Sequence, residues 1–123
     1  MSNNHNIFVY GTLRSGFHNN YLLDGAKLIG KGKTKTKMAM FLSGIPYVNR
    51  SQKKYQIVGE VYEVDDSTLK RLDRLEGHPD WYKREPEPIL MENGEEITAE
   101  LYLNDNNKNL AETGDYETNI KRN

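Results

Sequence analysis

The sequence contains no cysteine, and this absence removes several kinds of chemistry at once. A chain without thiols has no disulfide bridge, no thiolate zinc site, no iron–sulfur cluster and no cysteine nucleophile. It also has no run of about 18 consecutive apolar residues, which excludes a membrane-spanning helix. Its first residues show neither the basic nor the apolar segment of a secretory signal. We therefore expect a cytoplasmic domain with no membrane partner.

Hydrophobic residues are scarce as well, at 36% of the 123 residues. Eight tyrosines, three phenylalanines and one tryptophan compensate in part, because a tyrosine ring is apolar behind its hydroxyl. A chain of this length corresponds to one domain and buries roughly two-thirds of its unfolded surface. We predict a single domain over residues 1–123, with a tail from about residue 118 that the sequence does not predict to be ordered.

Net charge is nearly absent, at a formal −1, but the two parts of the chain differ. Residues 1–56 carry nine Lys or Arg and one acid, whereas residues 57–123 carry eight Lys or Arg and seventeen acids. Much of the basic excess comes from the lysine stripe, in which every second residue is basic: Lys31, Lys33, Lys35 and Lys37. On a strand these side chains share one face, which we interpret as solvated or as a charge-protected sheet edge. An anion-attracting, nucleic-acid-binding surface is the alternative, although no aromatic residue is interleaved with the lysines.

The apolar pattern predicts a strand-rich fold with one clear helix. Strands are expected at residues 7–10, 26–37, 45–48, 57–64 and 96–103, with residues 38–42 continuing or following the second. The helix is expected at residues 66–76, because N-cap candidates precede it and Gly77 and Pro79 follow. Asn93 and Gly94 indicate a hairpin turn. Since Pro86 and Pro88 lack N–H groups, we expect the second half of residues 81–90 to be at most an edge strand. These elements predict an α+β domain, a curled sheet or small barrel.

Glu76 has an unusual position within the predicted helix. The apolar stripe is formed by Leu69, Leu72 and Leu75, and Glu76 lies on the same face as this stripe. Glu76 is also the last helical residue, where the helix dipole disfavours a negative charge. Both effects raise the pKa of a carboxyl group, and a raised pKa suits a general base near neutral pH. The alternative is that Glu76 swings into solvent at a frayed helix end.

A second unusual segment follows the first predicted strand, at residues 10–14 (YGTLR). Backbone N–H groups around such a turn can converge on an anion, and Gly11 allows a close approach to the chain. The segment is not a P-loop, because the Gly-x-x-x-x-Gly-Lys pattern is absent.

Other catalytic patterns are missing. The three histidines, His5, His18 and His78, have no metal-binding spacing. There is no Gly-x-Ser-x-Gly elbow of a hydrolase and no Gly-x-Gly-x-x-Gly fingerprint of a dinucleotide site. We therefore expect neither a metal nor a cofactor.

Several short segments resemble the gamma-glutamyl cyclotransferase superfamily and, within it, the gamma-glutamylamine cyclotransferase-like branch. They occur in the family's order at residues 8–14 (FVYGTLR), 59–62 (GEVY), 72–77 (LDRLEG) and 81–84 (WYKR). Residues 114–116 (GDY) are similar to the branch's C-terminal segment, with Tyr116 in the place of a tryptophan. The resemblance extends over roughly residues 6–117. It implies a small mixed β-barrel flanked by helices.

The resemblance also implies an activity: cofactor-free conversion of a γ-glutamyl amine or amide to 5-oxoproline and a free amine. The enzyme would be an acyltransferase or lyase acting on a small molecule, and we expect a monomer. By match of position, Glu76 would be the general base and acid. Substrate would be held by Tyr10, Gly11, Thr12 and Leu13, with Tyr82 as a supporting contact.

Two other functions remain open from the sequence. The same fold can serve as a catalytically silent ligand-binding domain, although the presence of Glu76 argues against this. The lysine stripe alone motivates a nucleic-acid binder, which we rank below both. The amine half of the substrate is not predicted.

Overall fold

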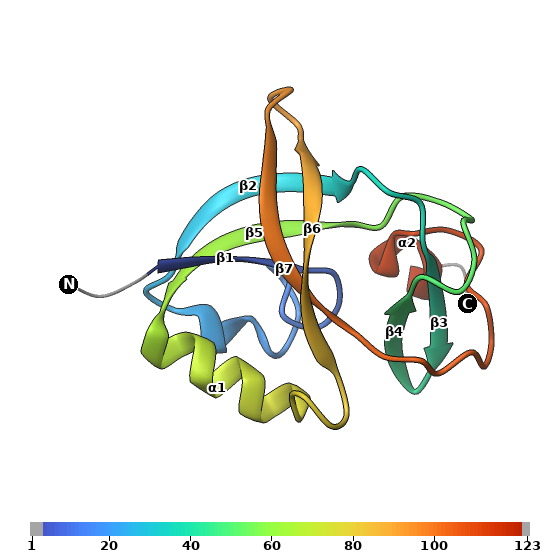
Figure 1. The fold of residues 1–123 in the computed structure, drawn as a ribbon, viewed down its shortest axis with the longest axis horizontal. Coiled ribbons are helices and arrows are strands. Elements are labelled where there is room, and N and C mark those ends of the chain that lie inside the picture. The colour runs from blue at the N-terminus through green and yellow to red at the C-terminus, as the bar shows by residue number, and fades with distance from the viewer. Residues whose placement is uncertain (1–3, 122–123) are drawn as a thin grey trace.

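The computed structural model describes residues 4–121, which fold around a closed five-stranded β-barrel (Figure 1). The strands of the barrel follow one another in the order β1-β5-β2-β6-β7. Their bounds are β1 Asn4–Val9, β2 Lys27–Thr34, β5 Val58–Asp65, β6 Lys83–Met91 and β7 Glu96–Leu103. Within the same residues, the other elements are the 3-10 helix η1 Asn20–Leu23, the hairpin strands β3 Ala39–Ser43 and β4 Ile45–Asn49, and the helices α1 Asp66–Glu76 and α2 Tyr116–Lys121. The predicted α+β class, a small mixed barrel flanked by helices, is confirmed.

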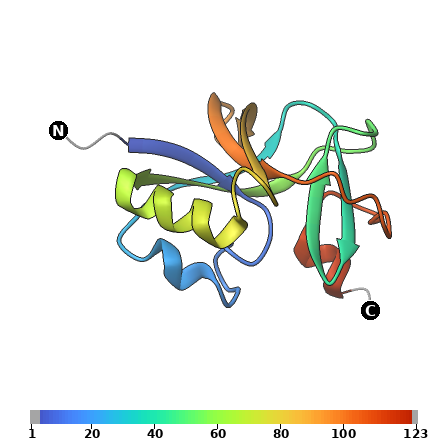
Figure 2. The ribbon, with the colours of Figure 1, turned by 60° about the horizontal axis from the view of Figure 1, so that its bottom comes forward.

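Strand β1 closes the barrel because it pairs along both edges, antiparallel with β5 and parallel with β7. Its side chains alternate between two faces, and both faces are covered. Ile7 belongs to a buried cluster that includes Leu72 of α1, whereas Phe8 belongs to the cluster that includes Leu101 of β7. Figure 2 shows α1 running beneath the barrel, with η1 beside it. The apolar run is therefore buried on both sides, as its composition predicts.

Helix α1 has the predicted bounds. The carboxylate of Asp65 caps its N-terminus by accepting the Thr68 N–H at 2.8 Å, and Gly77 ends it with φ 67°, a left-handed conformation that favours glycine. The predicted apolar stripe is wrong for Leu75, which is 46% exposed. The reason is geometric: at about 100° per residue, the position of Leu75 is about 120° around the helix from that of Leu69. By the same rotation, Glu76 lies within about 20° of Leu69.

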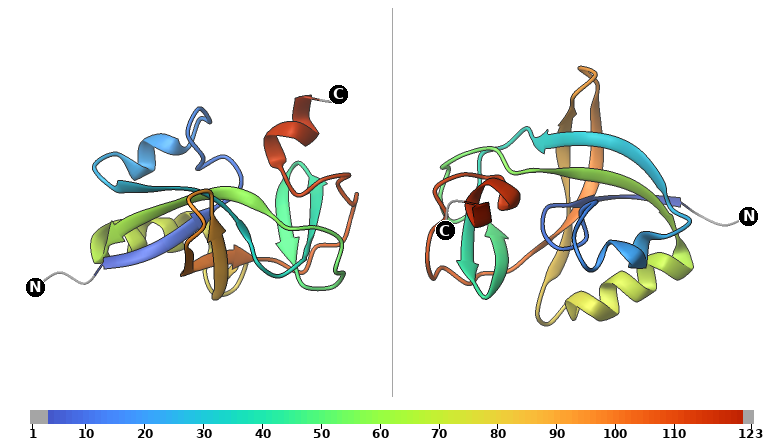
Figure 3. Two further views of the ribbon diagram at one scale, coloured as in Figure 1. Left: turned by 90° about the horizontal axis from the view of Figure 1, so that it is seen from above. Right: turned by 180° about the vertical axis from the view of Figure 1, so that it is seen from behind.

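The hairpin β3–β4 stands beside the barrel and is held by the C-terminal segment. Leu42 N–H donates to the Asn109 carbonyl at 2.9 Å, and Ala111 N–H donates to the Met40 carbonyl at 2.8 Å. Both views of Figure 3 show α2 next to this hairpin. Of the tail from about residue 118, residues 118–121 belong to α2, and residues 122 and 123 lie outside the described part.

The proline-containing strand β6 corrects one expectation. It is not an edge strand, because it pairs with β7 over residues 83–90 and with β2 over residues 89–91. The missing N–H groups are tolerated because β2 pairs with β6 only beyond the prolines. At Pro88 itself, the carbonyl accepts the Lys35 N–H at 2.9 Å.

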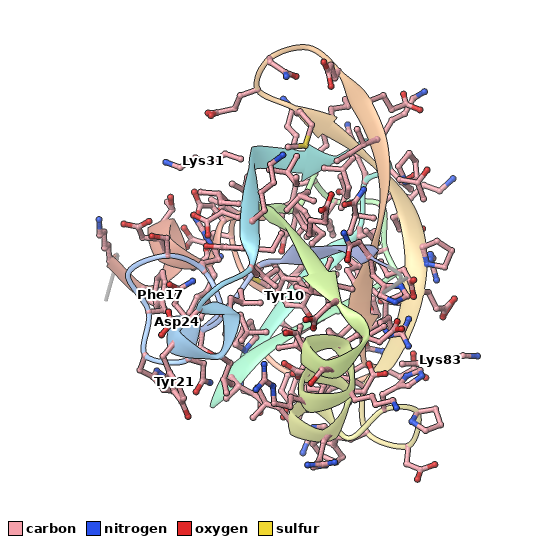
Figure 4. All side chains as sticks on the ribbon, turned by 90° about the vertical axis from the view of Figure 1, so that its left-hand side faces the viewer. Tyr10, Phe17, Tyr21, Asp24, Lys31 and Lys83 are labelled. Atoms are coloured by element: carbon pink, nitrogen blue, oxygen red, sulfur yellow. The ribbon has the colours of Figure 1, made fainter. Side chains whose placement is uncertain are left out.

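The lysine stripe is exposed at all four positions, but β2 ends at Thr34, so only its first two lysines lie on the strand. Lys31 points outward from the molecule (Figure 4). Lys35 forms an exposed ion pair with Glu96 at 2.9 Å. Between the lysines, Thr34 is buried and its hydroxyl donates to the Thr36 carbonyl. Among residues 4–121, no helix has the length and apolarity needed to cross a membrane.

Candidate active site

A pocket of about 60 Å³ lies where the chain leaves β1. Its walls come from four parts of the sequence: the end of β1 with the segment after it, the end of α1 with the loop that follows it, the tip of the hairpin β3–β4, and β7. It is lined by Phe8, Val9, Tyr10, Gly11, Thr12, Leu13, Ile45, Pro46, Glu76, Tyr82 and Tyr102. The structure thus brings all six sequence-predicted site residues together in one pocket.

Glu76 is the one carboxylate of this pocket. Its side chain is half-buried, and within residues 4–121 it makes no hydrogen bond and no ion pair. Burial raises the pKa of Glu76 from 4.5 to about 7, because the charged form loses its hydration. A frayed end with Glu76 in solvent is not observed. The group can therefore both accept and release a proton near neutral pH.

Three tyrosines surround this carboxylate, and each uses its hydroxyl to bond to the protein. Tyr10 donates to the carbonyl of Tyr102 at 2.5 Å, and Tyr82 donates to the carbonyl of Pro46 at 2.8 Å. Tyr102 donates to Asp73 Oδ1 at 2.7 Å. Burial raises the pKa of all three above the ordinary tyrosine value, and the nearby Glu76 charge adds to this. They are neutral at physiological pH, which leaves Glu76 as the group that titrates there.

The segment 11–13 offers hydrogen-bond donors to the same pocket. In the described part of the chain, the backbone N–H groups of Gly11, Thr12 and Leu13 donate to no acceptor. The carbonyls are used instead: Thr12 accepts the Asn19 N–H at 3.1 Å, and Leu13 accepts from Asn20 Nδ2 at 2.9 Å. The Thr12 hydroxyl accepts from Asn19 Nδ2 at 2.8 Å, so this side chain holds the turn. Successive free N–H groups of this kind suit a carboxylate or an oxyanion.

Gly11 is required for space rather than for an unusual backbone angle. A Cβ at this position would lie 2.8 Å from Cγ of Pro46, at the tip of the hairpin. A larger residue would therefore push the hairpin away from the segment that carries the free N–H groups.

The segment after the pocket is anchored by buried charges. Arg14 is 6% exposed, and its Nη1 donates to Asp115 Oδ1 at 2.9 Å, so this cation serves the C-terminal segment and is not part of the pocket. Buried Glu60 accepts the Ser15 N–H at 2.7 Å. The rings of Phe17 and Tyr116 lie 5.5 Å apart. These contacts give a structural account of the segments at residues 59–62 and 114–116.

Sequence reasoning missed Tyr102 and the hairpin tip. Tyr102 falls on the polar phase of β7, yet it is 3% exposed because α1 covers that face of the barrel as well. Because Tyr102 alternates with the apolar residues of β7, the sequence pattern assigns it to the solvent-facing side. Ile45 and Pro46 enter the pocket only because the hairpin folds back onto the segment after β1, and no local pattern signals that contact.

The pocket supplies no obvious place for a metal. Among the described residues, no three His, Asp or Glu side chains are grouped to hold an ion. What the pocket does combine is a carboxylate that can exchange a proton near neutral pH with neighbouring N–H donors that can stabilise developing negative charge on oxygen.

Comparison with known proteins places this geometry in context. A family model described as gamma-glutamyl cyclotransferase, AIG2-like, matches residues 7–118. A protein of Methanocaldococcus jannaschii provisionally named gamma-glutamylcyclotransferase is 53% identical over 113 residues, covering 90% of this chain and 94% of that protein. The gamma-glutamylaminecyclotransferase of Bos taurus is 39% identical over 87 residues, covering 63% of this chain and 52% of the bovine protein. The crystal structure of an AIG2-like protein from Mus musculus aligns with a TM-score of 0.75 at 30% identity, over 83% of this chain and 78% of that one.

Proposed function

The chain belongs to the gamma-glutamyl cyclotransferase, AIG2-like family of enzymes, and from this premise we propose that it cyclises a γ-glutamyl amine or amide to 5-oxoproline. In the reaction, the α-amino nitrogen of the substrate attacks its own γ-carbonyl carbon. A carbon–nitrogen bond forms in the ring, the bond to the amine half breaks, and the amine leaves. No cofactor takes part.

Glu76 supplies the proton transfers. An α-ammonium group cannot attack, so the Glu76 carboxylate first removes one of its protons. The attacking nitrogen then carries one proton more than the product amide keeps. Glu76 passes two protons in turn from the ring nitrogen to the leaving nitrogen, which departs as an ammonium ion. The carboxylate is regenerated at the end of each cycle.

The segment 10–13 would hold the glutamyl part of the substrate. Because nucleophile and carbonyl belong to one molecule, the main task of the protein is to keep the substrate folded back on itself. The free N–H groups of Gly11, Thr12 and Leu13 can bind the α-carboxylate or the oxygen of the tetrahedral intermediate. Tyr10 and Tyr82 provide neutral walls on which the aliphatic part of the glutamyl group packs.

One observation carries this proposal: a single unpaired carboxylate with a pKa of about 7 shares a pocket with three unpaired backbone N–H groups. A buried carboxylate without a partner costs stability, and such a cost is typical of a functional group. The pocket contains no other charged side chain in the described residues, so nothing within it would neutralise Glu76 before the substrate enters.

The test is release of 5-oxoproline from a panel of γ-glutamyl amines, peptides and amides. We expect turnover whose kcat/KM rises with pH through about 7, because the free enzyme must hold Glu76 deprotonated. Glu76→Gln should fold normally and lose at least about 100-fold in kcat, the usual contribution of a general base. Glu92→Gln, a change of an exposed carboxylate in the β6–β7 turn, is the matched control.

If Glu76→Gln keeps activity within threefold of wild type, the catalytic assignment is wrong. If the protein binds 5-oxoproline but turns over no member of the panel, the ligand-binding domain replaces the enzyme as the better proposal.

A further inference from the structure

A network of charged groups outside the pocket ties the last turn of α1 to the barrel. Asp73, three residues before Glu76, receives two hydrogen bonds from Arg84 of β6: Nε to Oδ1 at 2.9 Å and Nη2 to Oδ2 at 3.0 Å. The remaining arm of the guanidinium, Nη1, pairs with Glu100 of β7. Such two-pronged pairs fix orientation as well as distance. The end of the helix is thereby attached to two strands at once.

The Asp73 carboxylate is also bonded to a wall of the pocket. Its Oδ1 accepts the Tyr102 hydroxyl at 2.7 Å, and the carbonyl of Tyr102 in turn accepts the Tyr10 hydroxyl at 2.5 Å. Both tyrosines line the pocket that holds Glu76. One carboxylate therefore joins the helix end, β7 and the residue after β1.

The loop between α1 and β6 completes the connection. It leads from the helix directly into β6 (Figure 1). His78 N–H donates to the Asp73 carbonyl at 2.9 Å, and Arg84 N–H donates to Nδ1 of His78 at 3.1 Å. Tyr82 N–H donates to the carbonyl of Glu76 itself at 3.1 Å. Hydrogen bonds from loop residues therefore hold the backbone of the helix end at Asp73 and at Glu76.

We propose that Arg84 and Asp73 are positioning residues that keep the Glu76 carboxylate inside the pocket. This rests on the proposed role of Glu76 in proton transfer. Neither residue lines the pocket, so neither touches the substrate. They act through the helix end: a carboxylate displaced by about 1 Å from its productive position loses rate steeply.

The position of Glu76 also determines how strongly its proton is held. The groups that face it are Tyr10, Tyr82 and Tyr102, from the residue after β1, the loop after α1, and β7. Asp73 lies on its own helix turn, and His78 follows. Because burial alone raises the pKa of Glu76, releasing the helix end lets water reach the carboxylate and lowers its pKa toward 4.5.

A matched pair of variants separates positioning from general stability. Arg50 makes a similar fork on β6, with Nε and Nη2 on Glu87 Oε2 and Nη1 on Glu85, but it bonds to no residue of α1. Arg84→Ala and Arg50→Ala each remove one arginine and leave its two carboxylate partners without that cation. Each variant is assayed for kcat and KM across pH, and the Glu76 carboxyl is titrated by NMR in protein labelled with ¹³C-glutamate.

We expect Arg84→Ala to lower kcat by at least about tenfold with KM changed less than about threefold. The acidic limb of its kcat/KM profile and the pKa of Glu76 measured by NMR should both fall by about one unit or more. Guanidinium ion added to Arg84→Ala should restore part of the rate, and Arg84→Lys should lie between wild type and alanine, because lysine keeps the charge but not the fork. Arg50→Ala should leave the acidic limb and the Glu76 titration in place.

The proposal would be overturned if Arg84→Ala and Arg50→Ala changed kcat and the acidic limb of the kcat/KM profile equally. An unchanged Glu76 pKa in folded Arg84→Ala would also overturn it. If Arg84→Ala does not fold, Asp73→Asn gives the same readouts, since the amide can still accept from Tyr102 while the ion pair is lost. If wild type releases no 5-oxoproline, the proposed function has failed. The NMR titration then decides the positioning role by itself.

Discussion

Glu76→Gln is predicted to change stability in a strongly pH-dependent way. In the folded protein the pKa of Glu76 is about 7, against 4.5 for the exposed group that the unfolded chain presents. Below pH 4.5 the carboxyl is protonated in both states and costs nothing. Between pH 4.5 and 7 the unfolded chain has released the proton and the folded chain has not, so folding becomes less favourable as pH rises. Above pH 7 the penalty is constant, at about 3 kcal/mol.

The glutamine side chain has nearly the same shape and cannot ionise, so the variant lacks this penalty. The two proteins should have similar stability at pH 4.5, and Glu76→Gln should be more stable by about 3 kcal/mol at pH 8. For a chain of this size the difference corresponds to roughly 10 °C in Tm. Urea denaturation of both proteins at a series of pH values measures it, and subtraction cancels the titration of all other groups. Glu92→Gln provides the baseline for loss of one exposed carboxylate.

A difference between the two stability curves that stays flat within about 0.5 kcal/mol from pH 4.5 to 8 would refute the burial argument. The proposed proton transfer would then lose its physical basis, because a solvated Glu76 would be fully ionised at neutral pH and a weak base.

Two further predictions concern the segment after β1 and the lysine stripe. Gly11→Val should weaken binding of 5-oxoproline by at least about tenfold in calorimetry, because the valine side chain meets Pro46, whereas Thr12→Ala should stay within about threefold because backbone groups are the donors. A melting curve for each variant controls for fold damage, and a folded Gly11→Val that binds 5-oxoproline as wild type does would place the glutamyl site elsewhere. Replacing all four lysines of the stripe by glutamine should leave turnover within about twofold and stability within about 1 kcal/mol of wild type, because exposed charges contribute little. A salt-sensitive nucleic-acid affinity that is present in wild type and lost in this variant would favour the nucleic-acid-binding function instead.

The elements that sequence predicts best are those determined by nearby residues. The helix 66–76 is set by its own ends, the Asp65 cap and the left-handed Gly77, so its bounds needed no tertiary information. Strand β7 has the predicted bounds because its alternation reports one buried face. The unusual position of Glu76 could also be read locally, since the helical rotation that aligns it with Leu69 is a property of any helix.

What sequence could not provide is the closure of the barrel. The pairing of β1 with β5 and with β7 joins residues separated by more than fifty positions, and no local pattern records it. The pairing of β2 with residues 89–91, equally distant in sequence, makes β6 an interior strand despite Pro86 and Pro88. The arrangement of the strands also brings Tyr102 against the helix end, where its hydroxyl meets Asp73. Residues whose role depends on such pairings stay hidden until the strands are arranged in space.

In the proposed mechanism, stability and reactivity are coupled through one physical quantity, the hydration of Glu76. The burial that holds its pKa near 7 is the same burial that destabilises the folded state above that pH. A change that admits water to the carboxylate should therefore relieve the penalty and weaken the base together, whereas Glu76→Gln removes both at once. The Arg84–Asp73 pair opposes that relaxation: without a tether, the last turn of α1 would lower its free energy by turning the charge outward. An unpaired carboxylate can remain inside the pocket because the turn that carries it is attached to β6 and β7 on the outside.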